Sequence, residues 1–316
     1  MNIGIDMMGG DFAPLEAVKG LHLYLENNVH APAAFFCIGQ EDKVLPLLQE
    51  YGLDKHPAIR FIPAPEVIGY HEHPTKALKE KQQSSIAIGF HLLATGKTDA
   101  FISAGNTGAM LVGTLYSIKA LPGIQRPTIA TLVPKLDGSN GILLDVGLNT
   151  DCKPENLNQF AVLGSLYASN ILGVSNPAVA LLNVGEEEGK GNLLAQAAYP
   201  LLKENADINF TGNVEGRDVF TGKADVIVCD GFTGNVILKM AESIYDIARQ
   251  RNLHNDDYLH RFHYENYGGT PVLGVAKPVI IGHGISNGKA FQNMLKLAIK
   301  MIESDLCGQI KEKYKD

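Results

Sequence analysis

The stretch Thr98–Ala109, TDAFISAGNTGA, contains a short apolar segment, Ala100–Ile102, that is followed at once by small and polar residues. An apolar helical pattern, Thr107–Lys119, begins within the same stretch. A strand that runs directly into a helix leaves free backbone N–H groups at the helix N-terminus, where they and the helix dipole attract an anion. The sequence therefore predicts an α/β fold in which this loop binds an anionic ligand.

The loop also carries side chains that suit an anion. Ser103, Asn106 and Thr107 offer hydrogen bonds, and the glycines Gly105 and Gly108 allow the backbone to approach a ligand closely. Taken alone, the same residues are also typical of an ordinary strand-to-helix turn. The rest of the chain decides between these two interpretations.

Three further predicted strands end in glycine together with Asp, Asn, Ser or His. Ligands in open α/β sheets bind outside the carboxyl ends of the strands, so four such loops favour one shared anion site over four unrelated turns. Asp11, Gly234, Asn235 and His283 are the candidate ligand-binding residues in the three additional loops. The loops are Asp6–Asp11, Asp230–Asn235 and His283–Gly288, after the predicted strands Met1–Ile5, Ala224–Cys229 and Pro278–Gly282.

Apolar, β-rich runs alternate with helical patterns along the whole chain. This alternation predicts a three-layer α/β/α fold, in which helices cover both faces of a largely parallel sheet. The other predicted strands are 34–38, 59–62, 128–133, 142–146, 179–184 and 208–210, and the predicted helices are 15–27, 76–94, 107–119, 155–172, 192–204 and 289–304. We expect residues 1–316 to form a single functional unit with a polar helical excursion at about 239–266.

Composition excludes several classes of protein. Of the 316 residues, 45% are hydrophobic and 19% are charged, which is ordinary for a globular chain, and a net charge of −7 disfavours nucleic-acid binding. No two of the four cysteines form a CxxC motif. We therefore expect a cytosolic protein in which these cysteines are reduced thiols. No signal peptide and no membrane-spanning run is expected.

Two familiar motifs are incomplete. Gly284–Gly288 matches G-x-S-x-G, but no histidine follows Ser286 to complete a hydrolase triad in the usual order. The stretch Gly282–Ala290 has the wrong spacing for a P-loop, and Ala290 stands where Ser or Thr would reach Mg²⁺. Asp145 and Asp151 offer carboxylates, but no fixed spacing requires a metal, and we expect no cofactor.

The stretch Asn183–Gly191, NVGEEEGKG, places three glutamates and then Lys190 between glycines at a predicted helix start. It is either a solvated turn or a loop that holds Lys190 as a mobile cation over an anionic substrate. Phe210–Gly216 repeats the pattern of a strand followed by glycine and Asn213.

Together, these motifs resemble the PlsX family, the acyl-acyl-carrier-protein:phosphate acyltransferases of bacterial phospholipid synthesis. The resemblance covers nearly the whole chain, with the motifs in order. They are Asp6–Asp11 with Pro14, Ser103–Gly108, Asn183–Gly191, Asn209–Gly216, Cys229–Asn235 and Tyr267–Pro271.

The resemblance implies a fold related to phosphotransacetylases and to isocitrate and isopropylmalate dehydrogenases, usually as a homodimer. It implies that acyl-acyl-carrier protein and inorganic phosphate are converted to acyl phosphate and free carrier protein, which feeds a downstream membrane glycerol-3-phosphate acyltransferase. Lys190, Asn106 and His283 are then the expected catalytic residues. The expected substrate-binding residues are Asp11, Ser103, Gly105, Thr107, Gly108, Asn213, Gly234, Asn235, Lys79 and Lys81.

Two departures from the family pattern matter. The family commonly has Arg and Lys before a Ser pair, whereas this chain has Lys79 and Lys81, and lysine lacks the bidentate fork of arginine. The segment between Asn235 and Tyr267 is shorter and more polar than is usual. In the family this segment is associated with membrane contact. We expect a cytoplasmic protein, and whether the shorter segment of this chain supports peripheral membrane association stays open.

Three alternatives remain at this stage. A coenzyme A-dependent phosphotransacylase would use the same phosphate chemistry with a nucleotide-bearing donor. A decarboxylating dehydrogenase of the related fold would need a nicotinamide site and a metal-binding aspartate set. A sensor would bind acyl or phosphorylated ligands without consuming a thioester.

Overall fold

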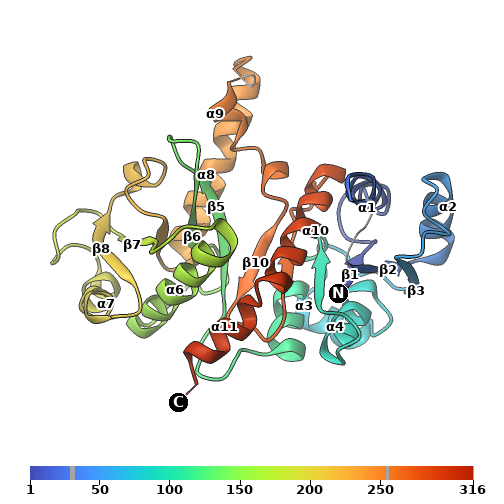
Figure 1. Cartoon of the computed structure of the whole chain (residues 1–316), viewed down its shortest axis with the longest axis horizontal. Helices are drawn as coiled ribbons and strands as arrows, with labels where there is room; N and C mark the ends of the chain where they lie inside the picture. The colour runs from blue at the N-terminus through green and yellow to red at the C-terminus, as the bar shows by residue number, and fades with distance from the viewer. Residues whose placement is uncertain (29–32, 254–255, 316) are drawn as a thin grey trace. The chain divides into compact units, whose positions relative to one another are not determined.

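The computed structural model of the chain describes residues 1–28, 33–253 and 256–315. These residues form two compact units (Figure 1). Unit 1 contains Met1–Ala120 and Tyr264–Cys307, and unit 2 contains Leu121–His263 and Gly308–Asp316. That residues 1–316 act as one functional unit stays a prediction.

Unit 1 contains a mainly parallel sheet in the order β3-β2-β1-β4-β11-β10. β10 is antiparallel to its neighbour β11, and the β1–β2, β1–β4, β2–β3 and β4–β11 pairs are parallel. Because β1, β4 and β11 are adjacent and parallel, the loops that follow them leave the same edge of the sheet. The strands are β1 (Asn2–Asp6), β2 (Ala34–Gly39), β3 (Ile59–Pro63), β4 (Ala100–Ser103), β10 (Thr270–Leu273) and β11 (Val279–Ile281).

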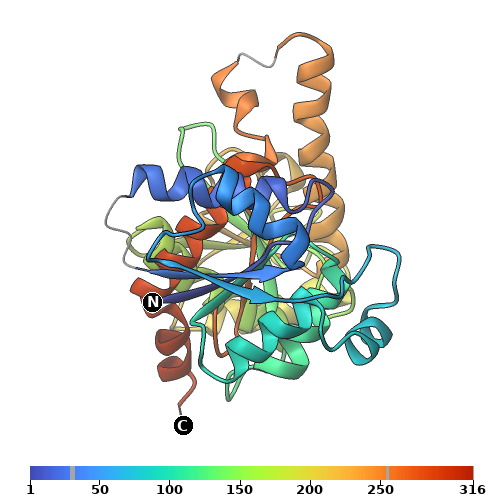
Figure 2. The same ribbon diagram turned by 90° about the vertical axis from the view of Figure 1, so that its right-hand side faces the viewer.

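Helices cover both faces of this sheet. Figure 2 shows α1 and α2 on one face of the blue strands and the teal helices on the other. The inner strands β1, β2, β4 and β11 are mostly buried and apolar, as expected for a parallel sheet covered on both sides, whereas the edge strand β3 is partly exposed. The helices are α1 (Leu15–Asn27), α2 (Glu41–Glu50), α3 (Pro74–Glu80), α4 (Ser85–Ala94), α5 (Thr107–Gly113, continued by a π-helical turn at Thr114–Ile118) and α10 (Gly288–Glu303).

The strands of unit 2 follow the order β5-β6-β9-β7-β8, in which the β5–β6 pair is antiparallel and the β6–β9, β9–β7 and β7–β8 pairs are parallel. Helix α8 of this unit projects away from the sheet, and the short α9 packs back against it through Tyr245 and His260, whose ring centroids are 6.0 Å apart (Figures 1 and 2). The strands are β5 (Thr128–Pro134), β6 (Asn140–Leu144), β7 (Ala178–Leu182), β8 (Asn209–Val214) and β9 (Val226–Val228). The helices are α6 (Pro154–Tyr167, continued by a π-helical turn at Ala168–Leu172), α7 (Leu193–Glu204), α8 (Gly231–Gln250) and α9 (Asp257–His260), and α11 (Leu306–Lys313) spans the boundary of the units.

The α/β class and the largely parallel sheets confirm the sequence prediction. The prediction of one helix over 76–94 is wrong, because the chain leaves the helix after Glu80 and α4 begins at Ser85. The Ser84 hydroxyl accepts a hydrogen bond from the Ala87 N–H at 3.2 Å and so caps the new helix. Among the described residues, no helix combines the length and apolarity needed to cross a membrane.

Candidate functional site

Three of the four predicted loops meet in unit 1. The Gly282 N–H donates to the Ser103 carbonyl at 2.8 Å, and the Asp11 N–H donates to the Gly284 carbonyl at 2.7 Å. These two bonds join the loops that follow β1, β4 and β11. The convergence inferred from the sequence is therefore present for Asp6–Asp11, Ser103–Asn106 and His283–Gly288.

A buried carboxylate organises the first two loops. The Ser103 hydroxyl donates to Asp6 Oδ2 at 2.6 Å and accepts from the Gly105 N–H at 2.9 Å, while Asp6 Oδ1 accepts from the Met8 N–H at 2.9 Å. Burial raises the pKa of Asp6, and the hydrogen bonds that it accepts oppose this shift. Ser103 and Gly105 are thus held by Asp6, which the sequence analysis quoted only as part of a motif.

Gly9 leaves no room for a side chain between these loops. A Cβ atom at this position would lie 2.5 Å from the Gly105 nitrogen and 2.6 Å from Asp6 Oδ2. The backbone of the first loop therefore contacts the backbone of the second directly. This close approach explains the glycine in physical terms, without reference to a ligand.

The Asn106 side chain is fully used within the protein. Its Oδ1 accepts from the Ala109 N–H at 2.9 Å and so caps α5, while its Nδ2 donates to the carbonyls of Gly69, Tyr70 and Glu72 at 2.9–3.3 Å. Asn106 is also buried. It fixes the loop that precedes α3, and this arrangement makes it a positioning residue.

Tyr70 lies where the three loops meet, although the sequence analysis did not select it. Its hydroxyl donates to the Ala104 carbonyl at 3.0 Å, and a Cβ atom at Gly284 would lie 3.3 Å from the same hydroxyl. Burial, with a smaller contribution from the charge of Asp11, raises the pKa of Tyr70 to about 12. Tyr70 follows a strand by a long irregular loop, so no periodic pattern in the sequence points to it.

The remaining candidates of unit 1 have different surroundings. His283 and Asp11 are exposed at the joined loops, and the His283 Nδ1 accepts from the Ile285 N–H at 3.4 Å. Thr107 is exposed in the first turn of α5, whereas Gly108 lies against Pro74. Lys79 is exposed at the end of α3.

Lys81 is held within its own loop. Its Nζ lies 2.6 Å from Glu72 Oε1 and donates to the Val67 carbonyl at 2.8 Å. The hydrogen bond with Lys81 lowers the pKa of Glu72. In this arrangement the ammonium group of Lys81 closes the loop that carries Tyr70.

In unit 2, the fourth predicted loop becomes the first turn of α8. Asp230 caps this helix by accepting from the Thr233 N–H at 2.9 Å. Gly234 packs so closely on the loop after β6 that a Cβ atom would lie 1.9 Å from the Asp145 carbonyl oxygen. The Asn235 Nδ2 donates to the Val146 carbonyl at 3.1 Å, so both residues join the two loops.

Asp145 anchors a turn. Its carboxylate accepts hydrogen bonds from the Asn149 N–H and side-chain amide at 2.6 and 2.7 Å, and from the Leu148 N–H at 3.2 Å. Burial raises the pKa of Asp145, and the hydrogen bonds that its carboxylate accepts partly oppose this shift. Among the described residues, no group of three or more His, Cys, Asp or Glu side chains is placed to hold a metal ion.

Lys190 has the most accessible charge among the candidates of unit 2. Its side chain is 52% exposed, and its Nζ lies 3.8 Å from Glu187 Oε1. The loop that carries it is nevertheless fixed, because the Asn183 Nδ2 donates to the Lys190 carbonyl at 3.1 Å. Gly191 has φ +95°, and a Cβ atom there would lie 2.3 Å from Asn183 Oδ1, so only glycine fits.

Asn213 supports the same loop from β8. Its Nδ2 donates to the Glu187 carbonyl at 2.9 Å. Its Oδ1 is buried and has no hydrogen-bond partner among the described residues. Asn213 therefore holds the Lys190 loop through its amide group and leaves one acceptor unused.

The predicted site residues thus form two sets, one in each unit. Asp11, Ser103, Gly105, Asn106 and His283 lie on joined loops of unit 1. Lys190 and Asn213 belong to one loop system of unit 2, and Gly234 and Asn235 belong to another at the start of α8. Each set lies at the carboxyl ends of parallel strands, where α/β proteins bind ligands.

The fold is that of the phosphotransacylases. The structure is similar to a phosphotransacetylase from Streptococcus pyogenes, with a TM-score of 0.66, 18% identity and coverage of 96% of this chain and 94% of that chain. It is similar to a branched-chain phosphotransacylase from Enterococcus faecalis, with a TM-score of 0.64, 16% identity and coverage of 96% and 99%. At these identities the likeness concerns the fold.

Sequence comparison identifies the family. Residues 1–309 match the model of the fatty acid synthesis protein family. The chain is 44% identical to a phosphate acyltransferase of Dictyoglomus turgidum and 43% identical to one of Halothermothrix orenii. These alignments cover 99% of this chain and 97% and 98% of the relatives. The chain belongs to this family, the PlsX family, as its motifs predicted.

Proposed function

We propose that this enzyme transfers an acyl group from acyl-acyl-carrier protein to inorganic phosphate and releases acyl phosphate and free carrier protein. The observation that carries the proposal is the match to phosphate acyltransferases at 41–44% identity over nearly the whole chain. Acyl-carrier protein as the donor, and the roles of individual residues, go further than that match. The acyl phosphate would then supply a membrane glycerol-3-phosphate acyltransferase.

The reaction does not need a nucleophilic side chain of the protein, because phosphate itself is the nucleophile. An oxygen of phosphate attacks the thioester carbonyl carbon, the new C–O bond forms, and the C–S bond breaks as the carrier thiolate leaves. A thiol with a pKa of about 8.5 leaves readily as its thiolate, so a strong general acid is not needed. The protein has to orient phosphate, exclude water and stabilise the tetrahedral oxyanion.

The two sets of residues suit different parts of this task. The loops joined through Ser103 and Asp11 present backbone groups of glycine-rich turns, which suit a phosphate, and His283 and Thr107 lie exposed beside them. In unit 2, the exposed Lys190 offers a positive charge to an anionic substrate. We assign Asn106, Asn213, Asn235 and Lys81 to positioning, because each holds a neighbouring loop.

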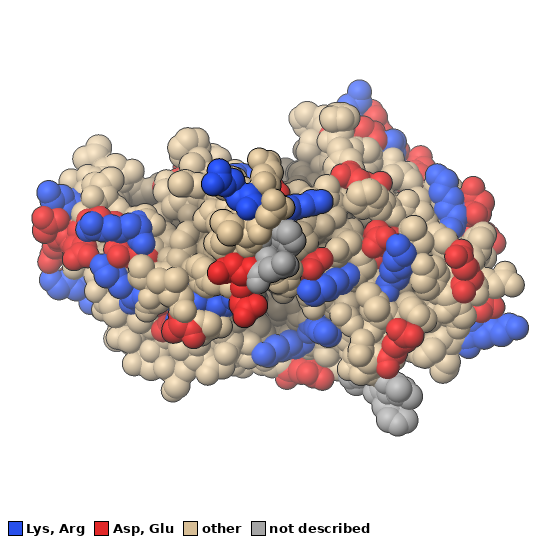
Figure 3. All heavy atoms as spheres, turned by 90° about the horizontal axis from the view of Figure 1, so that it is seen from above, with Lys and Arg blue, Asp and Glu red and all other residues tan. Residues whose placement is uncertain are grey.

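Docking of the carrier requires local positive charge, because acyl-carrier proteins are acidic and this chain carries −7. On the face seen in Figure 3, positive and negative side chains of the described residues alternate without a wide patch of one sign. Lys76 and Lys79 on α3, and Arg249 and Arg251 at the end of α8, are exposed candidates. Arg261 is different, because its guanidinium donates to the Lys135 carbonyl and to Asn140.

A homodimer would cover the apolar side chains that α8 exposes. Phe232, Val236, Met240 and Ile247 are each more than half exposed and follow helical spacing. If α8 forms the dimer contact, Met240→Asp should convert the protein from dimer to monomer in light scattering. An unchanged mass would exclude this surface.

The decisive experiment compares donors and acceptors. Palmitoyl-acyl-carrier protein is incubated with and without phosphate, and palmitoyl-coenzyme A serves as the alternative donor; acyl phosphate is measured in each case. We expect acyl phosphate only with phosphate present, and faster turnover with the carrier protein. Equal thioester loss without phosphate would identify a thioesterase, and faster turnover with coenzyme A would identify the alternative phosphotransacylase.

A further inference from the structure

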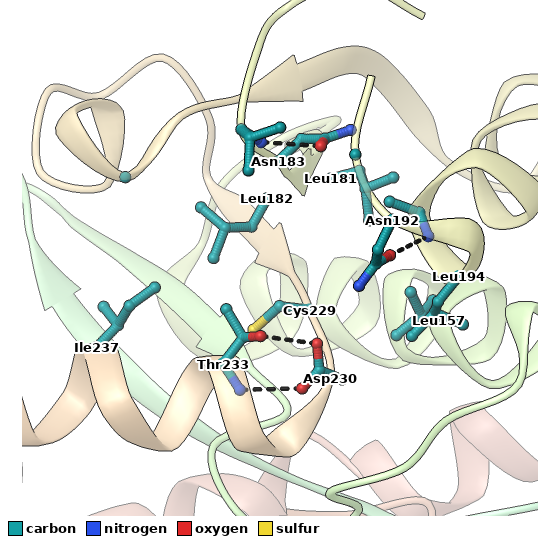
Figure 4. A pocket seen from close by; sticks show the side chains of 14 residues that line it. Leu157, Leu181, Leu182, Asn183, Asn192, Leu194, Cys229, Asp230, Thr233 and Ile237 are labelled. Atoms are coloured by element: carbon teal, nitrogen blue, oxygen red, sulfur yellow. Dashed lines mark hydrogen bonds between the residues drawn. The ribbon is translucent and has the colours of Figure 1, made fainter. Parts of the chain in front are cut away.

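Unit 2 contains a pocket of about 290 Å³ that the proposed roles above do not use. Figure 4 shows it between the end of β7, the start of α7 and the first turns of α8. This volume is close to the lower end of the range for small-molecule sites, roughly 300–1,000 Å³. All of its lining residues belong to unit 2, so the pocket is complete within that unit.

The walls of the pocket are aliphatic. Leu157 and Leu181 are buried and form part of its floor, and Leu182, Leu194 and Ile237 are partly exposed around the open space (Figure 4). Partly exposed aliphatic side chains that face one another gain free energy when an apolar group displaces water between them. The pocket therefore favours a ligand with an aliphatic part.

The Asp230 carboxylate and the Asn192 amide oxygen at the pocket are already used to cap helices. Asp230 Oδ1 accepts from the Thr233 N–H, and Oδ2 accepts from the Thr233 hydroxyl at 2.8 Å. Asn192 Oδ1 accepts from the Ala195 N–H at 2.8 Å. Both helix N-termini are thus capped by the protein itself, and the Asp230 carboxylate would repel an anion. An anionic headgroup would not be held inside this pocket.

The position of the pocket relates it to Lys190. Asn183, Val184 and Gly191 line it, and these residues are the two ends of the loop that carries Lys190. The loop is fixed by the bond from Asn183 to the Lys190 carbonyl. A ligand whose aliphatic tail fills the pocket would therefore emerge beside the base of the loop that presents a cation.

We infer that this pocket binds the aliphatic chain of the acyl group and sets the preferred chain length. The inference builds on the proposed phosphate acyltransferase function and adds the residues that select the donor. Because the lining is aliphatic, affinity should rise with each methylene added to the chain until the pocket is filled. Each buried methylene should strengthen binding by about fourfold.

Leu194→Trp tests the inference, because the larger side chain fills the pocket. Leu193→Trp is the matched control, because the neighbouring Leu193 is 85% exposed and does not line the pocket. Titration calorimetry with octyl phosphate and ethyl phosphate measures the contribution of the chain. We expect octyl phosphate to bind at least tenfold more weakly to Leu194→Trp, but normally to Leu193→Trp, and ethyl phosphate to be unaffected by either change.

A second variant guards against misfolding of the first. Ile237→Ala widens the pocket from α8 and should shift the preferred donor towards chains longer by one or two methylenes, in a series of acyl-carrier proteins from C8 to C18. Unchanged octyl phosphate binding in folded Leu194→Trp, or an unchanged chain-length profile in Ile237→Ala, would overturn the inference. Neither result would affect phosphate-dependent acyl transfer by the wild type, whose absence would instead overturn the proposed function.

Discussion

The loops at the sheet edge of unit 1 and the Lys190 loop of unit 2 differ in how accessible their candidate side chains are. In unit 1, the polar side chains are bonded to one another: Ser103 to Asp6, and Asn106 to α5 and to the loop at Tyr70. In unit 2, Lys190 is half exposed and lies 3.8 Å from its acidic neighbour. A side chain whose hydrogen-bonding groups are all used within the protein can only position its neighbours. A side chain with groups still available can contact the substrate.

The largest effect is expected where unit 1 has no free space. Gly9→Ala places a Cβ atom 2.5 Å from the Gly105 nitrogen and must separate the two loops. A displacement of about 1 Å can cost about 100-fold in rate, so kcat/KM should fall by two orders of magnitude or more. Gly189→Ala is the control, because a Cβ atom there has no atom within 4 Å. Equal activity of the two variants would show that the close contact is not needed for catalysis.

The next effect tests whether Lys190 is as available as its exposure indicates. A hydrogen bond to a charged group contributes about 1.5–3 kcal/mol, so Lys190→Ala should lower kcat/KM for phosphate by roughly one to two orders of magnitude. Lys203→Ala is the matched control, since Lys203 is also exposed and lies 2.9 Å from Glu188. If the folded Lys190→Ala enzyme kept its normal dependence on phosphate, Lys190 would be a solvated turn residue without a role in phosphate binding.

Most of the fold was predictable from the sequence. The difference between the bonded side chains of unit 1 and the exposed Lys190 of unit 2 was predictable only in part. The alternation of apolar runs and helical patterns identified most strands, because a buried parallel strand is a short apolar run between turn residues. It missed β10, which begins with the turn-forming pair Thr270-Pro271, and α2, which contains Pro46 in its interior. Both lie where local propensity opposes the final structure.

The site residues were predicted by position more than by role. Strand ends rich in Gly, Asn and Asp located the loops correctly, because a parallel sheet gathers its carboxyl ends at one edge. The sequence did not reveal that Asn106 would donate to three carbonyls more than thirty residues away, nor that Tyr70 would reach Ala104. These contacts join segments that no local pattern connects.

A smaller effect concerns the buried carboxylate of unit 1. The pKa of Asp6 is raised in the folded protein, so its contribution to stability is largest below its unfolded pKa and is lost as pH rises through the folded value. Relative to Asp6→Asn, the wild type should therefore gain stability as pH falls through the raised pKa of Asp6 towards the unfolded value of about 3.9, by at most about 1.4 kcal/mol per pH unit. Urea unfolding of both proteins measures the difference. A difference that grows with increasing pH would contradict the assignment of burial as the main cause.

The smallest effect is expected at Tyr70, which holds the joined loops through a neutral hydrogen bond to the Ala104 carbonyl. Such a bond contributes about 0.5–1.5 kcal/mol, and the side chain is 45% exposed, so Tyr70→Phe should raise KM for phosphate by roughly two- to fivefold. Because the pKa of Tyr70 is about 12, its hydroxyl keeps its proton in the ordinary assay range. The ratio of wild-type to Tyr70→Phe activity should therefore be constant between pH 6 and 9. A ratio that changes across this range would mean that Tyr70 exchanges its proton during the reaction, and that unit 1 contributes chemistry as well as position.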